Sequence, residues 1–175
     1  MPNWAMGDVT VTGTRDGITS FISRFVTEDD PRTIPGKRFF ARSFLDDRRP
    51  SVTDEIPEPA TADEQITYTF PVSFAWSAYS CVVSGYPERN QEECITLKEA
   101  CIEDQVEVRI TTIEYGMCLE EEIQCTAAGE LEVSERSLRQ ARCPSCGEIQ
   151  SVGSFDELSE VECSECYRTG LEEVL

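Results

Sequence analysis

The sequence has no histidine among its 175 residues, and it has only two lysines, Lys37 and Lys98. Without imidazole there is no histidine general base, no Ser–His or Cys–His nucleophile pair, and no zinc site of mixed cysteine and histidine ligands. The sequence also has no glycine-rich loop of the kind that cradles phosphates. We therefore expect a protein that is not an enzyme.

A long apolar run is missing as well. The longest stretch without a charged residue, 65–87, is interrupted by Pro71 and Gly85 and is rich in hydroxyl side chains, so it predicts no membrane span. The first residues show no basic segment followed by an apolar one, so no secretory signal is predicted. We expect a cytoplasmic protein, and in that reducing compartment closely spaced cysteines bind metal more often than they form disulfides.

Negative charge dominates the composition. The 34 acidic residues against 15 basic ones give a formal charge of −19. The exception is segment 32–49, in which six basic and two acidic residues give a local charge of +4. A chain this acidic repels nucleic acid and favours basic partners, with association rates that fall as salt rises. Solubility alone is the other interpretation of the same charge.

Hydrophobic periodicity predicts alternating strands and helices. Six apolar residues occupy every second position between Ile66 and Trp76, the clearest strand signal in the chain. Pro71 lies on the opposite face of this strand and predicts a bulge or an edge position. The other expected elements are a strand at 8–13, a helix at 17–27 capped by Asp16, a weak strand at 37–44, a solvated loop at 45–64, a helix at 92–104, and strands at 106–110, 117–125 and 131–133.

This order, β-α-β-β-α-β with one or two added strands, is typical of an α+β protein with an antiparallel sheet and helices on one face. We predict two domains, an α+β domain at 1–137 and a small cysteine-rich module at 138–175.

Three segments carry a resemblance to a known family. They are the opening Met-Pro-Asn-Trp with the Val-Thr-Val-Thr-Gly that follows it, Phe-Ala-Trp-Ser-Ala-Tyr at 74–79, and Thr-Thr-Ile-Glu-Tyr-Gly-Met at 111–117. Over most of residues 1–133 the chain resembles phage and plasmid accessory proteins with a ferredoxin-like fold. The resemblance implies that fold and a mobile-element origin, hence a host-cell cytoplasm, but no activity. Ala5 departs from the cysteine that the family often has, and the C-terminal cysteine pairs lie outside its common core.

The strongest chemical signal is a pair of Cys-x-x-Cys motifs. Cys143 and Cys146 are separated by sixteen residues from Cys163 and Cys166. Each motif lets a tight turn direct two sulfurs at one ion, and two such turns complete a tetrahedral site. The segment resembles a zinc ribbon, so we expect one structural zinc ion per chain, with rubredoxin-like iron or a redox-active or metal-free thiol set as alternatives. So short a segment cannot form an independent hydrophobic core, and zinc binding can supply the missing folding free energy.

The five other cysteines show no such spacing. Cys94, Leu97 and Cys101 have the spacing of one helix face, and the remaining cysteines lie on or beside expected strands. We expect core thiols, and a second metal site is the alternative. The five cysteines outside the two motifs are Cys81, Cys94, Cys101, Cys118 and Cys125.

Three functions are compatible with this sequence. The first is an inhibitor that mimics nucleic acid and binds a basic nucleic-acid-processing or host-defence protein. The second is a nucleic-acid adaptor that uses the zinc ribbon and the basic segment, in which Phe39, Phe40 and Phe44 alternate with arginines as in single-strand binders. The third is a small metal-dependent or redox enzyme. No membrane partner is expected, and the candidate partner-binding residues are Glu120, Glu121, Glu122, Asp54, Glu55, Arg38 and Arg42.

The three consecutive glutamates also allow a magnesium or acid–base site. Strand alternation places Glu121 on the face opposite Glu120 and Glu122, so at most two carboxylates converge. A solvated sheet face is the interpretation that we favour.

Overall fold

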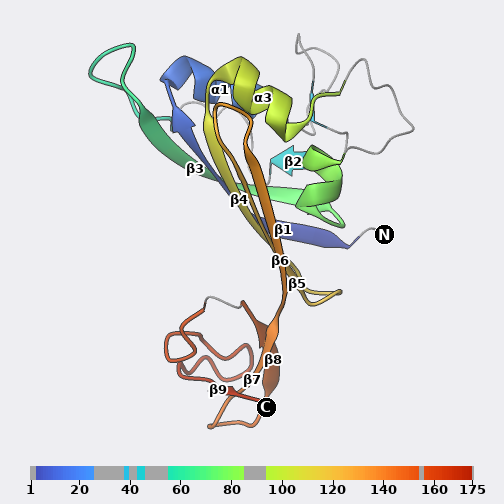
Figure 1. Cartoon of the computed structure of the whole chain (residues 1–175). Helices are drawn as coiled ribbons and strands as arrows, with labels where there is room; N and C mark the ends of the chain where they lie inside the picture. Colours follow the sequence, from blue (N-terminus) through green and yellow to red (C-terminus); the bar gives the residue numbers. More distant parts are fainter. Residues whose placement is uncertain are drawn as a thin grey trace.

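The computed structural model of the chain describes residues 3–25, 38–39, 43–45, 55–84, 94–153 and 156–174. It is an α+β protein with one large and one small sheet (Figure 1). The elements are β1 (Trp4–Gly13), α1 (Arg15–Ser23), β2 (Ser43–Leu45), β3 (Ile66–Ala75), the π-helix η1 (Tyr79–Val83), α3 (Leu97–Asp104), β4 (Glu107–Glu114), β5 (Leu119–Cys125), β6 (Leu131–Ser137), β7 (Arg139–Arg142), β8 (Ile149–Val152) and β9 (Glu172–Glu173).

The large sheet has the strand order β2-β3-β1-β4-β5-β6, and all of its neighbouring strands are antiparallel. β1 lies inside the sheet, where Val9 is opposite Phe70 of β3 and Ile110 of β4. The small sheet has the order β8-β7-β9, again antiparallel. β6 leads almost directly into β7, so the chain passes from one sheet to the other within a single extended segment (Figure 1).

One face of the large sheet carries the helices and the core. Alternate residues of the strands, such as Val9, Phe70 and Ile110, are fully buried together with the apolar side of α1. The other face is polar, and there the hydroxyl of Thr10 is hydrogen-bonded to that of Thr69 at 2.9 Å. Side chains of β3 thus alternate between the two faces of the sheet, and the predicted strand that begins at Ile66 is confirmed. Pro71 is tolerated because β2 pairs only with Val72–Phe74, so β3 is locally an edge strand at the proline in the described chain.

Both helices are shorter than the sequence predicts, α1 because it ends at Ser23 and α3 because it begins only after Thr96. Thr14, not Asp16, caps α1, and its hydroxyl accepts a hydrogen bond from the N–H of Gly17. α3 begins after Thr96, which forms a capping box with Glu99. Cys94 therefore precedes the helix and forms a parallel bridge with Arg38, so the predicted helix face of Cys94, Leu97 and Cys101 is wrong.

A buried ion pair fixes the two helices against each other. Arg24, at the end of α1, donates from Nε to Asp104 Oδ2 at 2.6 Å and from Nη2 to Asp104 Oδ1 at 2.8 Å. The side chains of Arg24 and Asp104 are only 10% and 5% exposed. These hydrogen bonds raise the pKa of Arg24, and Glu103 adds a further contact at 3.0 Å. Such a bidentate pair joins the ends of elements that are 80 residues apart in the chain.

Candidate metal centre

The two Cys-x-x-Cys motifs fold into two turns with the same backbone hydrogen bonds. In the first turn, the N–H of Cys143 donates to the carbonyl of Glu148 at 2.8 Å, and the N–H of Gly147 donates to the carbonyl of Cys143 at 2.8 Å. In the second turn, the N–H of Cys163 donates to the carbonyl of Arg168 at 2.9 Å, and the N–H of Tyr167 donates to the carbonyl of Cys163 at 3.0 Å. The short spacing of each pair therefore determines a local structure that presents both sulfurs on the same side.

The fifth residue of each turn has a left-handed backbone. Gly147 has a φ of 81° and Tyr167 a φ of 58°. Glycine adopts this conformation without steric cost, whereas for other L-residues it costs about 1–2 kcal/mol. The second turn therefore carries this cost at Tyr167, whereas the first does not carry it at Gly147.

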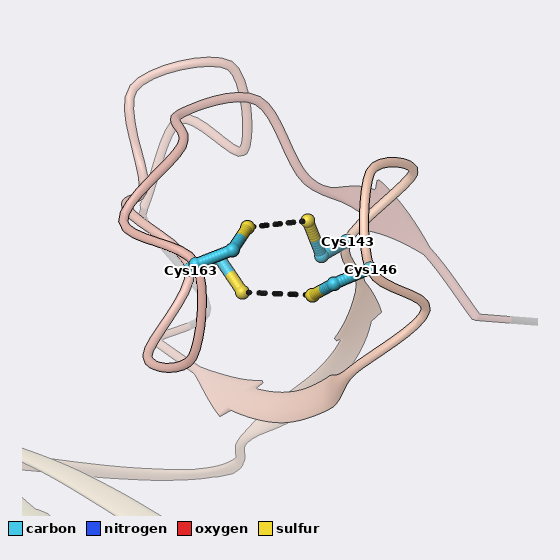
Figure 2. Close-up of side chains that lie close together, drawn as sticks. Cys143, Cys146 and Cys163 are labelled. Carbon is cyan, nitrogen blue, oxygen red and sulfur yellow. Dashed lines mark hydrogen bonds between the residues drawn. The ribbon is translucent and has the colours of Figure 1, made fainter.

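The two turns face each other and bring four sulfurs together (Figure 2). Cys143 Sγ lies 3.6 Å from Cys166 Sγ, and Cys146 Sγ lies 3.5 Å from Cys163 Sγ. All four sulfurs lie within 4.8 Å of one another. Disulfide sulfurs are bonded at about 2.0 Å, so none of these contacts is a disulfide. Four sulfurs about 2.3 Å from a tetrahedral centre would be separated by about 3.8 Å, which is close to the separations of the two pairs above. The four cysteines can therefore hold one metal ion.

Backbone N–H groups point at the sulfurs and change their acidity. The N–H groups of Cys146 and Ser145 lower the pKa of Cys143 to about 6. The N–H of Glu148 also stabilises the Cys146 thiolate, but desolvation and the three neighbouring thiols outweigh it and raise the pKa of Cys146 to about 12. Deprotonation of Cys143 is thus favoured, whereas the neighbouring thiols oppose deprotonation of Cys146. A cation would offset that opposition.

The small sheet has little apolar material around this site. Among the residues that the structure describes, its buried cluster contains two of the sulfur-bearing residues and three other side chains, and the half-buried Leu158 and Val161 pack against it. These three are Ala141, Val152 and Leu171. In contrast, the eight acidic residues between 139 and 174 are all exposed, against three arginines in the same range. The centre is therefore a small sulfur-lined core beneath an acidic surface.

The other five cysteines do not assemble a second site. Among the described residues, the only group of three or more cysteine or acidic ligands placed for a metal ion is the one above. Cys101 of α3 and Cys125 of β5 are neighbours, and burial raises the pKa of both thiols. Thiols held protonated in this way are poor nucleophiles and poor metal ligands.

The three consecutive glutamates do not form the predicted solvated face. Glu121 is 1% exposed and lies on the helix side of the sheet, where its carboxylate accepts hydrogen bonds from the N–H of Ala78 at 2.8 Å and of Tyr79 at 3.4 Å. Thr112 donates its hydroxyl to the same carboxylate at 3.3 Å. Burial raises the pKa of Glu121. Glu121 therefore caps the start of η1 from within the core and exposes no carboxylate at the surface, while its predicted role in partner binding stays a prediction.

The two flanking glutamates lie on the opposite face of β5. Glu122 accepts a hydrogen bond from Arg109 Nε at 2.8 Å. Glu120 is 8% exposed and lies opposite Arg136 of β6. The sequence prediction that Glu121 faces away from its two neighbours is correct, but none of the three is an open surface carboxylate.

The remaining residues predicted to bind a partner, and the phenylalanines of the basic segment, are partly exposed, partly buried and partly outside the described residues. Glu55 is exposed and Arg38 is half-buried, whereas Asp54 and Arg42 lie outside the described residues. In the basic segment, Phe39 is buried between the rings of Phe21 and Phe25, at centroid distances of 5.4 and 4.9 Å. Phe39 therefore belongs to the core and is not a stacking surface for bases, while the side chains of Phe40 and Phe44 lie outside the described part.

No helix in the described part of the chain is long and apolar enough to cross a membrane. No family model matches the chain, and no curated protein or solved structure matches it significantly.

Proposed function

We propose that Cys143, Cys146, Cys163 and Cys166 bind one zinc ion per chain and that residues 138–175 are a zinc ribbon. The observation that carries this proposal is the set of four sulfurs, all within 4.8 Å of one another, on two matching turns. Zinc is favoured because four cysteine thiolates are one of the ligand sets typical of structural zinc sites. Four thiolates leave no coordination position for water, so the ion has a structural role and no catalytic one.

The strands of the large sheet support a ferredoxin-like assignment for residues 1–137. The element order from β1 to β4 is β-α-β-β-α-β, apart from the short η1, and the corresponding strands are adjacent as β2-β3-β1-β4. β5 and β6 then extend the sheet beyond β4 as the added strands. In this assignment the protein is a ferredoxin-like domain with a zinc ribbon attached through β6 and β7.

At the level of function, the protein acts by binding a basic protein that processes nucleic acid, and it competes there with the nucleic acid. The support is electrostatic: the net charge is −19, and the ribbon exposes eight carboxylates. Carboxylates that face arginines and lysines of a partner can occupy positions that phosphates otherwise take. The buried position of Phe39 and the acidic ribbon disfavour direct nucleic-acid binding.

A pull-down from nuclease-treated host lysate tests this function. We expect one basic nucleic-acid enzyme to be retained and to elute as salt rises. A ribbon variant with Glu160→Gln, Glu165→Gln and Glu173→Gln should release the partner at lower salt than a matched variant with the same charge change at Asp63→Asn, Glu107→Gln and Glu130→Gln. Salt-independent retention would contradict the proposal, and so would nucleic acid as the only material recovered from untreated lysate.

A further inference from the structure

β6 forms one edge of the large sheet, and within the described chain no strand pairs with its outer side (Figure 1). The strand is seven residues long, and six of its seven side chains are exposed. Leu131 and Val133 are 37% and 39% exposed on the face that carries the helices. An open edge of this length offers a row of backbone N–H and C=O groups that can pair with another strand.

We propose that β6 pairs antiparallel with β6 of a second copy of this chain, about a two-fold axis at Ser134. Residues directly opposite each other in a sheet share a face, so a symmetric pair of strands must be centred on a residue. A centre at Glu132 or at Glu135 places that carboxylate opposite its own copy, which is repulsive. The centre at Ser134 instead places Glu132 of each copy opposite Arg136 of the other.

The existing register of β5 and β6 extends this complementarity into the sheet. Arg136 lies opposite Glu120 of its own β5, and Glu132 lies opposite the neutral Gln124. In the pair of copies, Arg136 would lie between Glu120 of its own chain and Glu132 of the second copy. Negative and positive charges would then alternate across the three neighbouring strands on the polar face. On the helix-bearing face, Val133, which is exposed in one copy, lies directly opposite Glu135 of the second copy, and the two Val133 side chains are diagonal neighbours near the axis.

Charges on an edge strand usually prevent edge-to-edge pairing, because most registers bring like charges together. On β6 the order Glu132, Ser134, Arg136 makes one register attractive and leaves the others neutral or repulsive. The occupant that fits this edge is therefore another β6. Strand pairing with an unrelated protein is the alternative outcome of the test below.

Sedimentation of the full chain from about 2 to about 200 µM, a range in which small interfaces associate, tests the proposal. About 0.3 M salt screens the repulsion between two chains of charge −19. We expect a monomer–dimer equilibrium whose dissociation constant rises at least tenfold in Glu132→Lys and in Arg136→Glu. The double variant that swaps both charges should restore dimerisation. Glu107→Lys, with the same charge change within the sheet, should leave it unchanged.

A second measurement reads the register without altering charge. Ser134→Cys places two thiols at the axis, so mild oxidation should crosslink this variant far more than Glu135→Cys or the native chain. A native chain that stays monomeric throughout the range would overturn the proposal. So would a dimer that Glu132→Lys weakens no more than Glu107→Lys, or a charge-swapped variant that stays as weak as the single variants. Circular dichroism confirms that each variant is folded.

Discussion

Glu121 provides a sharp test of the packing described here, because a glutamate in an acidic run would ordinarily be a surface residue. Its carboxylate accepts two backbone N–H groups at the start of η1 and the hydroxyl of Thr112. In Glu121→Ala these buried donors lose their acceptor, at roughly 1–3 kcal/mol for each unsatisfied group. The longer bond to Tyr79 contributes less, and removal of a buried acid returns part of the cost.

We therefore expect Glu121→Ala to lower the free energy of unfolding by about 2 kcal/mol, or the melting temperature by about 4–8 °C for a chain of this size. The matched control is Glu122→Ala, one residue along the same strand. Its partner Arg109 has a side chain that is 58% exposed, so the loss should stay below about 1 kcal/mol. Urea unfolding at pH 7, followed by circular dichroism, measures both variants.

The pH dependence of Glu121 has a defined sign. Burial raises the pKa of Glu121, although its three hydrogen-bond donors oppose the shift, so the folded protein binds this proton more tightly than the unfolded chain does. The stability that this group contributes must fall as pH rises from its unfolded pKa, about 4.3, to its raised folded pKa. Glu121→Gln keeps an acceptor oxygen but has no such step. The stability of Glu121→Gln relative to the native chain should therefore increase with pH across that window. A difference that does not vary with pH, or a Glu121→Ala variant as stable as Glu122→Ala, would refute this account.

Three further predictions concern the two turns, the ion pair between the helices, and the metal ligand set. Gly147→Ala should lower ribbon stability by about 1 kcal/mol and Tyr167→Gly should raise it by up to about 1 kcal/mol, because both residues have a positive φ; thermal melts of the zinc-loaded protein compare them. Arg24→Met should cost about 3 kcal/mol because it leaves the buried Asp104 carboxylate without its cation, and Arg24→Met with Asp104→Leu should recover part of that loss in urea unfolding. Cys118→Ser should leave the metal content measured by mass spectrometry unchanged, and a loss of metal would show that the ligand set is wrong.

The parts of the structure that could be predicted from the sequence are those determined over short distances in the chain. The alternation in β3 identified a strand, because its period of two holds whatever the neighbouring strands are. Likewise, each Cys-x-x-Cys spacing determines its own turn, so the four sulfur-bearing residues could be named before their geometry was known. How the two turns meet, with Cys143 against Cys166 and Cys146 against Cys163, is seen only in the structure.

The failures are contacts between distant segments. Glu121 lies on the face opposite its neighbours, as alternation requires, but only the position of η1 on that face makes it a buried cap. Phe39 was compatible with either a stacking surface or the core, and its contacts with Phe21 and Phe25 decide this question. The start of α3 is a different kind of failure, because the capping box of Thr96 and Glu99 is a local signal. It begins the helix after Thr96, although the apolar spacing extends back to Cys94.

Metal content, measured together with the order of the ribbon, tests the central claim most directly. Native mass spectrometry of the purified protein should show one zinc ion per chain, and Cys163→Ser should lose it. On chelation, amide hydrogen exchange should increase throughout 139–174, because so small an apolar cluster cannot stabilise this segment without the ion. Residues of the large sheet should keep their protection. Iron in the site, or a metal-free protein whose ribbon amides remain protected, would contradict the account.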